Sequence, residues 1–270
     1  MSSASSPRAW PARLAGVAAA CAASLALGAG AMPLRVCADP NNMPFSNRRG
    51  EGFENKIAAV VASGLHRPLA YFWLPQRRGF VRNSLDAGRC DLVIGVPAGY
   101  GRVQPTRSYY RSSYVFVSRH DRAVAVDSFD DPALRTMRIG IQLAGSDNPP
   151  AAQALAARHL AGNVRGFTLY GDYSRPDPQR DIVDAVADGR VDVAVVWGPL
   201  AGYYARRAPV ALTLRAVAAA DDGPTTPFAF DIAMGVRRGD ASLLAAVDGV
   251  IARRQPEIDR ILRSYGVPLR

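Results

Sequence analysis

A ten-residue pattern occurs twice in this chain of 270 residues, once in each half. The first copy, LDAGRCDLVI, spans residues 85–94, and the second, VADGRVDVAV, spans residues 186–195. Each copy has the pattern of a helix end with a glycine, a charged turn and a buried strand. Both copies lead into a Gly/Pro-containing loop with aromatic residues, at residues 95–101 and 197–204. Two lobes of similar topology explain this repeat most economically.

Alternating strand and helix patterns surround both copies. The first half predicts strands at residues 34–38, 69–74 and 92–96, with a helix from Gly52 to Gly64 and a short helix before Gly88. The second half predicts strands at residues 137–141, 164–170 and 191–196, with helices at residues 150–160 and 179–187. Successive strand–helix–strand units imply a mainly parallel sheet with helical crossovers, so we expect an α/β fold.

Two further extended segments lie outside these units. They occupy residues 114–119 and 228–235, and the second leads to two predicted terminal helices. Two crossings between lobes would form a two-segment hinge. We therefore expect lobe one to comprise residues 32–118 and 226–270, and lobe two to comprise residues 119–225.

Residues 1–31 have the pattern of a signal peptide that is removed on export. Arg8 and Arg13 precede an apolar stretch at residues 14–27, and Ala29-Gly30-Ala31 supplies the small residues that cleavage requires. The apolar stretch is shorter than the roughly 20 residues that cross a bilayer. We expect an exported protein with no membrane span, located in the periplasm.

The charge balance is basic, with 33 Lys and Arg against 23 Asp and Glu. Nucleic-acid binding would require positive charge gathered with aromatic residues on one surface, whereas these arginines are scattered along the chain. The pattern favours a solvated basic surface and indicates no nucleic-acid partner. An acidic protein partner is compatible with it.

Polar and aromatic side chains follow the expected strands where those strands end, which is where ligands bind in open α/β sheets. Each has a structural alternative: residues 39–42 would satisfy backbone groups in a tight loop, residues 76–78 would form a solvated turn, and Trp197 would belong to the core. The candidate cleft residues are Asp39, Asn41, Asn42, Phe45, Gln76, Arg77, Tyr100, Arg102, Ser146 and Trp197.

No catalytic or metal-binding set emerges from the sequence. His66, His120 and His159 are isolated, without a second ligand at metal spacing. No Ser or Cys stands in a nucleophile elbow, and the glycine-rich loop at residues 95–101 lacks a Walker lysine and the GxGxxG spacing. We expect a protein that is not an enzyme.

Cys37 and Cys90 are the two cysteines that remain after signal cleavage. Export favours a disulfide between them. A geometric objection stands against it, because Cys37 lies near the end of its expected strand and Cys90 begins the next one. If these strands start together, the cysteines lie several residues apart, whereas a bridge needs Cα atoms within about 7 Å. Both outcomes stay open.

The order of elements resembles the type II periplasmic binding proteins, and several motifs resemble their amino-acid-binding branch. These motifs are PF at residues 44–45, GFE at residues 52–54 and DIAMGVRRGD at residues 231–240. Longer blocks are similar to one subfamily, the MoxJ/XoxJ-type proteins encoded beside pyrroloquinoline-quinone (PQQ) methanol and alcohol dehydrogenases. They include LRVCADPNNMPFSN, WLPQRRGFVRNSLDAGRCDLVIGVPAGY and FAFDIAMGVRRGD.

The resemblance implies a two-lobe periplasmic protein that helps a PQQ-dependent dehydrogenase to mature or to stay active. It implies no cofactor for this chain, since PQQ would belong to the partner dehydrogenase. The alternative function is that of a solute-binding subunit of an ABC importer for a small polar or anionic solute.

The chain departs from the amino-acid binders at two positions. Trp197 stands where those proteins commonly place an aspartate for the ligand's ammonium group, and a buried ammonium without a carboxylate partner is costly. Arg102 resembles their carboxylate-binding arginine, but the segment at residues 102–110 is shorter than usual. An α-amino acid ligand is therefore not expected.

Overall fold

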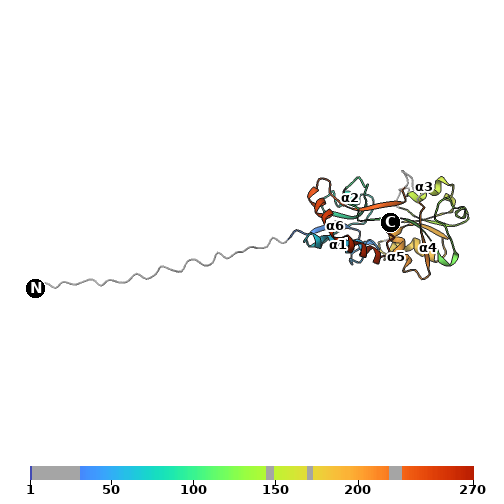
Figure 1. Cartoon of the computed structure of the whole chain (residues 1–270), viewed down its shortest axis with the longest axis horizontal. Coiled ribbons are helices and arrows are strands. Elements are labelled where there is room, and N and C mark those ends of the chain that lie inside the picture. The colour runs from blue at the N-terminus through green and yellow to red at the C-terminus, as the bar shows by residue number, and fades with distance from the viewer. Residues whose placement is uncertain (2–30, 144–148, 169–172, 219–226) are drawn as a thin grey trace. The chain divides into compact units, whose positions relative to one another are not determined.

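A computed structural model describes Met1 and residues 31–143, 149–168, 173–218 and 227–270 (Figure 1). Most of the expected signal peptide lies outside the described residues, as does Ser146, so both stay predictions. Among the helices that the structure describes, none has the length and apolar character needed to cross a membrane.

The first lobe contains the strands β1 (Leu34–Ala38), β4 (Leu69–Trp73), β5 (Leu92–Pro97) and β12 (Ala229–Val236). Their order is β4-β1-β5-β12, with β1 parallel to β4 and β5 and with β12 antiparallel to β5. The short strand β6 (Gln104–Pro105) pairs with β12. The predicted parallel unit of three strands is confirmed.

Helices cover both faces of this sheet (Figure 1). The long helices α1 (Phe53–Gly64) and α6 (Ala241–Ser264) pack on the face that carries Leu34 and Leu92. The short helix α2 (Phe80–Asn83) packs on the opposite face. This two-sided burial explains why the strands are almost continuously apolar rather than alternating.

The second lobe repeats the arrangement with the parallel strands β8 (Ile139–Leu143), β9 (Val164–Thr168) and β10 (Val193–Trp197). Helix α3 covers one face, whereas α4 and α5 cover the other. The bounds of these helices are Pro150–Ala157 for α3, Asp181–Ala187 for α4 and Gly198–Ala205 for α5. Short 3-10 helices occur at His120–Arg122, Pro132–Arg135, Ala161–Asn163 and Pro178–Arg180.

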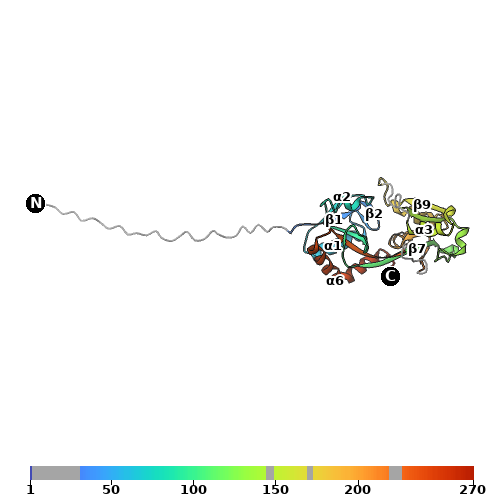
Figure 2. The same cartoon turned by 90° about the horizontal axis from the view of Figure 1, so that it is seen from above.

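Two long strands join the lobes (Figure 2). The first half of β7 (Tyr110–Arg119) pairs antiparallel with β12, and its second half pairs with β10 and with β11 (Leu212–Ala216). The sheet is therefore continuous from β4 to β9. The expected two-lobe α/β fold with two crossing segments is confirmed, whereas the exact lobe boundaries stay predictions.

The repeated pattern folds alike in both lobes. Asp91 accepts hydrogen bonds from the backbone nitrogen of Arg35 (3.1 Å) and from its Nε (3.2 Å). Asp192 accepts the same two bonds from Arg138, at 2.9 and 3.0 Å. Each aspartate thus joins the turn before one strand to the start of the neighbouring strand, so the sequence repeat is a structural repeat.

Cys37 and Cys90 form a disulfide, with their Cα atoms 5.4 Å apart. The geometric objection was wrong because Cys90 does not belong to a strand. Strand β5 begins at Leu92, and Cys90 lies in the preceding connection, on the sheet face that α2 covers. The offset along the sheet therefore does not separate the two sulfur atoms.

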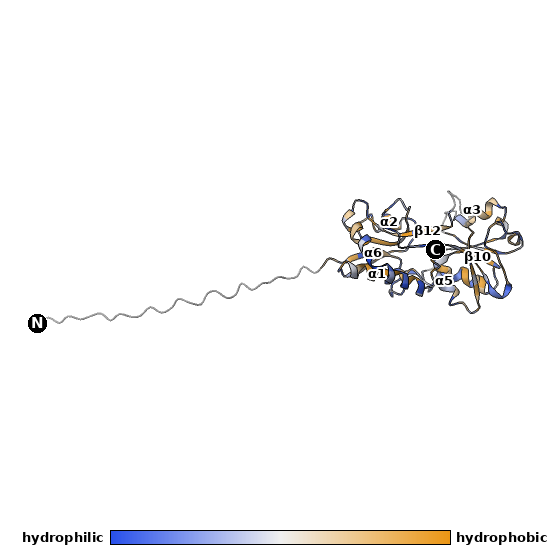
Figure 3. Ribbon diagram, viewed as in Figure 1, coloured by the Kyte–Doolittle hydropathy of each residue, from blue (hydrophilic) through white to orange (hydrophobic). Residues whose placement is uncertain are grey.

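Two other predictions differ from the structure. We expected two terminal helices, whereas the structure has the single helix α6. This helix continues through Pro256 because core residues lie on both sides of the proline, Val247 and Ile251 before it and Ile258 and Leu262 after it. The expected loop after β10 is helix α5, where proline is tolerated in the first turn. Figure 3 shows hydrophobic colour in strands such as β12 and also in the helices α3 and α5.

Candidate functional site

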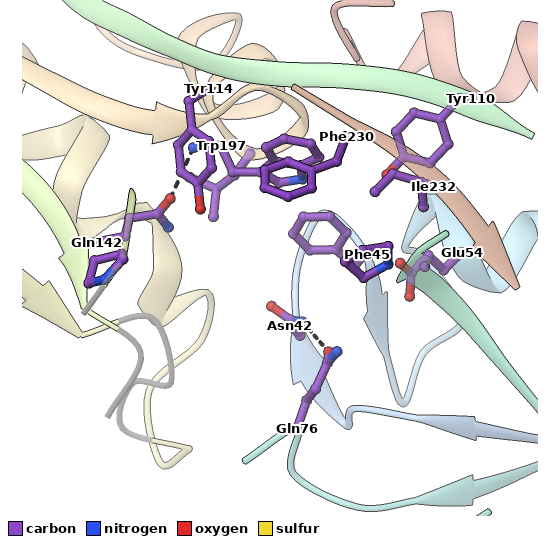
Figure 4. A pocket seen from close by; sticks show the side chains of 14 residues that line it. Asn42, Phe45, Glu54, Gln76, Tyr110, Tyr114, Gln142, Trp197, Phe230 and Ile232 are labelled. Carbon is purple, nitrogen blue, oxygen red and sulfur yellow. Dashed lines mark hydrogen bonds between the residues drawn. The ribbon is translucent and has the colours of Figure 1, made fainter. Parts of the chain in front are cut away.

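A cavity of about 270 Å³ lies where the carboxyl ends of β5 and β10 meet the crossing strands β7 and β12. This position agrees with the rule that ligands bind beyond the carboxyl ends of parallel strands. Both lobes contribute to its wall (Figure 4). The lining residues are Asn42, Phe45, Glu54, Gln76, Gly95, Pro97, Tyr110, Tyr114, Gln142, Pro149, Trp197, Leu200, Phe230 and Ile232.

Aromatic rings form much of the wall. The ring centroids of Tyr114 and Trp197 are 5.4 Å apart, and those of Trp197 and Phe230 are 5.8 Å apart, with interplanar angles of 62° and 71°. Such steep ring pairs are a favourable packing of aromatic groups. Phe45 enters the cavity from the loop after β1 and packs against Phe53 at 5.2 Å. The result is a set of ring faces and edges around one space.

Glu54 is the one carboxylic acid among the described lining residues. It lies in the first turn of α1, and a Cβ atom built on Gly95 would clash with its Oε1. The carboxyl group therefore rests directly against the backbone of β5, where only a glycine leaves room. Glu54 is half-buried and lines the cavity.

The protonation of Glu54 follows from this position. Loss of solvation, with a smaller contribution from the charge of Asp39, raises the pKa of Glu54 to about 8. The dipole at the start of α1 favours the charged form but does not offset the desolvation. At neutral pH most Glu54 side chains are consequently neutral.

Amide groups complete the polar part of the wall. Asn42 Nδ2 donates a hydrogen bond to Gln76 Oε1 at 3.1 Å. From the other lobe, Gln142 Oε1 accepts one from the backbone nitrogen of Trp197 at 3.0 Å. These bonds fix the orientation of the three amides beside the rings.

Asp39 belongs to the loop rather than to the cavity wall. Its side chain accepts hydrogen bonds from the backbone nitrogens of Asn41 (2.8 Å) and Gln76 (2.6 Å) and from the Tyr173 hydroxyl (2.5 Å). Burial, reinforced by that bond to Asp39, raises the pKa of Tyr173. These contacts agree with the structural alternative for Asp39, in which its side chain satisfies backbone groups of a tight loop.

The same loop is bonded to lobe two. Asn41 Nδ2 donates to the Arg175 carbonyl oxygen at 2.8 Å, and Gln179 Nε2 donates to the Asn41 carbonyl oxygen at 3.2 Å. The Tyr204 hydroxyl donates to the Met43 carbonyl oxygen at 3.2 Å. Asn41 therefore contacts the opposite lobe and not the cavity.

Three other candidates lie away from the cavity wall. Arg77 is exposed, with its guanidinium 5.0 Å from the ring centre of Tyr173. Tyr100 and Arg102 are exposed in the turn after β5. The structure thus brings together four of the candidates at one cavity, and their contact with a ligand stays a prediction. These four are Asn42, Phe45, Gln76 and Trp197.

Sequence reasoning missed Glu54 and the crossing-strand residues Tyr110, Tyr114 and Phe230. From the sequence, Glu54 is only an acidic residue that complements the helix dipole. One signal pointed to its position: Gly95 interrupts an apolar strand, and a glycine inside a strand often marks the close approach of another group. Among the described residues, no group of three or more His, Cys, Asp or Glu has the arrangement of a metal site.

No protein-family model matches the chain. Among curated proteins, protein MoxJ of Methylorubrum extorquens AM1 is 34% identical over 249 residues, which cover 87% of this chain and 81% of that protein. Protein MoxJ of Paracoccus denitrificans is 33% identical over 270 residues, which cover 92% of this chain and 94% of that protein.

Solved structures agree with these similarities. The periplasmic binding protein XoxJ of Methylobacterium extorquens AM1 has a TM-score of 0.72 and 36% identity, with 88% of this chain and 99% of that chain covered. MxaJ of Methlophaga aminisulfidivorans MPT has a TM-score of 0.75 and 27% identity, with coverages of 88% and 100%. An ancestral amino acid-binding protein, with a TM-score of 0.60 and 21% identity over 87% of this chain and 95% of that chain, supports the fold alone.

Proposed function

The chain belongs to the MoxJ family, and on this premise we propose that it is a non-enzymatic periplasmic accessory protein of a PQQ-dependent methanol or alcohol dehydrogenase. It would bind that enzyme and help it to mature or to stay active. The observation that carries the proposal is similarity to two MoxJ proteins over at least four fifths of their length. PQQ would remain with the dehydrogenase, and this chain would hold no cofactor of its own.

The composition of the cavity supports binding rather than catalysis. Its described lining contains one carboxylic acid and two tyrosines as ionisable groups, together with amides and apolar side chains. A nucleophile paired with a base, or an acid paired with a base, is what enzymatic cleft chemistry requires. The described lining residues offer no such pair.

The charge of the chain supports an acidic partner surface. The formal net charge is +10, and exposed arginines such as Arg78 and Arg102 occupy turns near the carboxyl ends of the first-lobe strands. Complementary charge mainly accelerates association and makes it depend on salt. We expect the complex to weaken as ionic strength rises.

A pull-down and an activity assay test this function together. The purified protein is mixed with the purified dehydrogenase of the same organism at low and at physiological salt. We expect co-purification and a rise in dehydrogenase activity or thermal stability, and no effect from an amino-acid-binding protein of the same fold as the control. Absence of binding together with unchanged dehydrogenase activity and stability would contradict the proposal.

The cavity favours a second candidate function, that of the binding subunit of a solute importer. A space enclosed by two lobes is where proteins of this fold close on a ligand. The described lining contains Glu54 and no arginine or lysine, which favours a neutral or cationic solute over an anionic one. A thermal-shift screen tests it, because a ligand that binds only the native state raises Tm. A broad screen without any shift would count against this function.

A further inference from the structure

We propose that the cavity binds a small organic cation, an alkylammonium ion without a carboxylate group, against the rings of Phe45, Trp197 and Phe230 and beside the carboxyl group of Glu54. This inference goes beyond the accessory role and does not depend on it. It assigns a chemical class of ligand to a cavity that both lobes line with aromatic rings.

The rings provide the first part of the argument. The faces of Trp, Tyr and Phe attract cations, and aromatic cages are a common means of recognising alkylated ammonium groups. Tyr110, Tyr114 and the three rings above all line the same space of about 270 Å³ (Figure 4). The steep angles between Tyr114, Trp197 and Phe230 turn the rings toward different sides of one ligand position.

Glu54 provides the second part. A carboxyl group removed from water is costly unless a cation or hydrogen-bond donors compensate it. Among the described residues the neighbouring charge that acts on Glu54 is Asp39, which has the same sign. The fold nevertheless places Glu54 against β5, where Gly95 makes room for it. A bound cation would supply the compensation that the described residues do not.

The positions of two other residues among those described argue against a zwitterionic amino acid as the ligand. Arg102, the expected partner of a ligand carboxylate, is exposed and does not line the cavity. Trp197 replaces the acid that usually holds the ammonium group from lobe two, but Glu54 offers a carboxyl group from lobe one. The described wall of the site therefore has groups for a cation and no charged group for the carboxylate of an amino acid.

Isothermal titration calorimetry with tetramethylammonium chloride tests the proposal on the intact protein. tert-Butanol serves as a neutral ligand of similar shape and sodium trimethylacetate as an anionic one, at constant ionic strength. We expect saturable binding of tetramethylammonium at least tenfold tighter than that of either control. At pH 9, where Glu54 is ionised, Trp197→Leu and Glu54→Gln should each weaken binding at least tenfold. Tyr100→Leu, which changes an exposed aromatic residue off the cavity wall, should not weaken it.

The pH dependence gives an independent readout. Glu54 must ionise to attract the cation, so affinity should rise with pH by at most about tenfold per unit up to pH 8 and then level off. The titratable groups that interact electrostatically with Glu54 are Asp39, Tyr71, Tyr109 and Tyr110. The three tyrosines stay neutral over this pH range because burial raises their pKa values. The Glu54→Gln variant should lose this dependence.

Several results would overturn the inference. These are equal affinity for tert-butanol and tetramethylammonium, no detectable heat or thermal shift with the cation, or unchanged affinity in both cavity variants whose circular dichroism shows a native fold. The titration uses this protein without the dehydrogenase. A failed pull-down therefore leaves the cation site standing, and a failed titration leaves the accessory role standing.

Discussion

The two halves of the sheet begin alike and become different toward the cavity. At their starts, Arg35 binds Asp91 and Arg138 binds Asp192 through the same backbone and side-chain atoms. Two residues further along β1, Cys37 is joined to Cys90. The corresponding pair in lobe two is Gly140 and Val191, which follow from the same offsets to the Arg–Asp pair.

That second pair shows how one position is stabilised in two ways. A Cβ atom built on Gly140 would lie 3.4 Å from Cγ2 of Val191 and 3.1 Å from Cβ of Ala194. Val191 therefore packs onto the glycine at the place where lobe one has its disulfide. In lobe one a disulfide attaches the segment before β5 to β1. In lobe two close packing attaches the segment before β10 to β8. The two lobes therefore share a topology but stabilise this contact differently.

The largest difference lies at the ends of the strands. β5 presents Gly95 with the Glu54 carboxyl group against it, whereas β10 ends at the indole of Trp197. The same scaffold thus offers a carboxyl group from one lobe and an aromatic face from the other. This contrast agrees with the view that functional groups are placed on a fold at its loops and strand ends rather than by the fold itself.

The first prediction concerns Glu54→Gln, which removes the carboxyl group that lobe one places against β5. The folded pKa of Glu54 lies at about 8, above its ordinary value of 4.5, so the native state is destabilised progressively as pH rises from about 4.5 to 8. The full shift corresponds to an upper limit of about 5 kcal/mol. We expect the variant to be more stable than the parent above pH 8, and the difference to shrink toward pH 5.

Urea unfolding at pH 5, 7 and 9 measures this difference. Glu257→Gln, which changes the half-buried partner of Arg254 on α6, serves as the control. The glutamine amide is itself desolvated, so the gain should fall short of the upper limit. A variant that is equally or less stable than the parent at pH 9 would show that Glu54 finds compensation in the native state.

The second prediction concerns removal of the Cys37–Cys90 disulfide, which has no counterpart at the corresponding position of lobe two. The disulfide closes a loop with a sequence separation of 53 residues, which corresponds to about 4 kcal/mol of stabilisation in the chain-entropy description. The double variant Cys37→Ala, Cys90→Ala should lower Tm by roughly 10 °C. Reduction of the parent protein should have a similar effect.

Hydrogen exchange locates the loss within the molecule. We expect faster exchange in β1, β4 and β5 and little change in β8 and β10, since the Gly140–Val191 packing does not depend on the disulfide. An equal loss of protection in both lobes would mean that the lobes unfold as one cooperative unit.

Much of this scaffold was predictable from local patterns. Apolar runs with turn signals identified the strands of both parallel units, and β1 has the predicted bounds at residues 34–38. The repeated pattern predicted two similar lobes, because glycine, charged turn and buried strand each have a local physical cause. The expectation of export favoured the disulfide that the structure contains, and only the assumption that Cys90 begins a strand opposed it.

The cavity was less predictable because tertiary contacts determine it. Trp197 and Phe45 were expected beside a cleft, since they follow strand ends. Glu54 was not, because its sequence position at the start of a helix gives no indication that the side chain turns toward β5. The continuity of α6 through Pro256 likewise depends on core contacts on both sides of the proline.

The third prediction compares the two Arg–Asp pairs directly. Asp91 also lies 3.7 Å from an Arg67 nitrogen and 3.8 Å from an Arg237 nitrogen, and its side chain is 12% exposed against 22% for Asp192. Losing several charge-assisted bonds at a mostly buried site costs more than losing them nearer the surface. We expect Asp91→Ala to destabilise by about 3 kcal/mol and Asp192→Ala by about 1–2 kcal/mol.

Acid titration provides the check on this pair. Burial raises the pKa of Asp91, but the hydrogen bonds from Arg35 outweigh burial and keep this pKa below its ordinary value. The hydrogen bonds from Arg138 lower the pKa of Asp192 to about 2. Both groups therefore contribute stability above about pH 4 that is lost as the pH falls toward 2. Each variant should lose part of this acid sensitivity, and equal losses of stability in the two variants would contradict the greater role of Asp91.

The smallest expected effect concerns the two glycines of the repeated pattern. Gly88 and Gly189 both have left-handed backbone conformations, with φ angles of +69° and +71°, so an alanine at either position costs about 1 kcal/mol. A Cβ atom built on Gly88 would have no atom within 4 Å. A Cβ atom built on Gly189 would lie 2.9 Å from Nη2 of Arg122. The other terminal nitrogen of Arg122, Nη1, lies 3.1 Å from Asp192. Because the Arg122 side chain is flexible and exposed, Gly189→Ala should be less stable than Gly88→Ala by only a few tenths of a kcal/mol. Parallel urea unfolding of the two variants measures the difference, and a substantially larger loss in Gly189→Ala would show that Arg122 is a firm part of the Asp192 cluster.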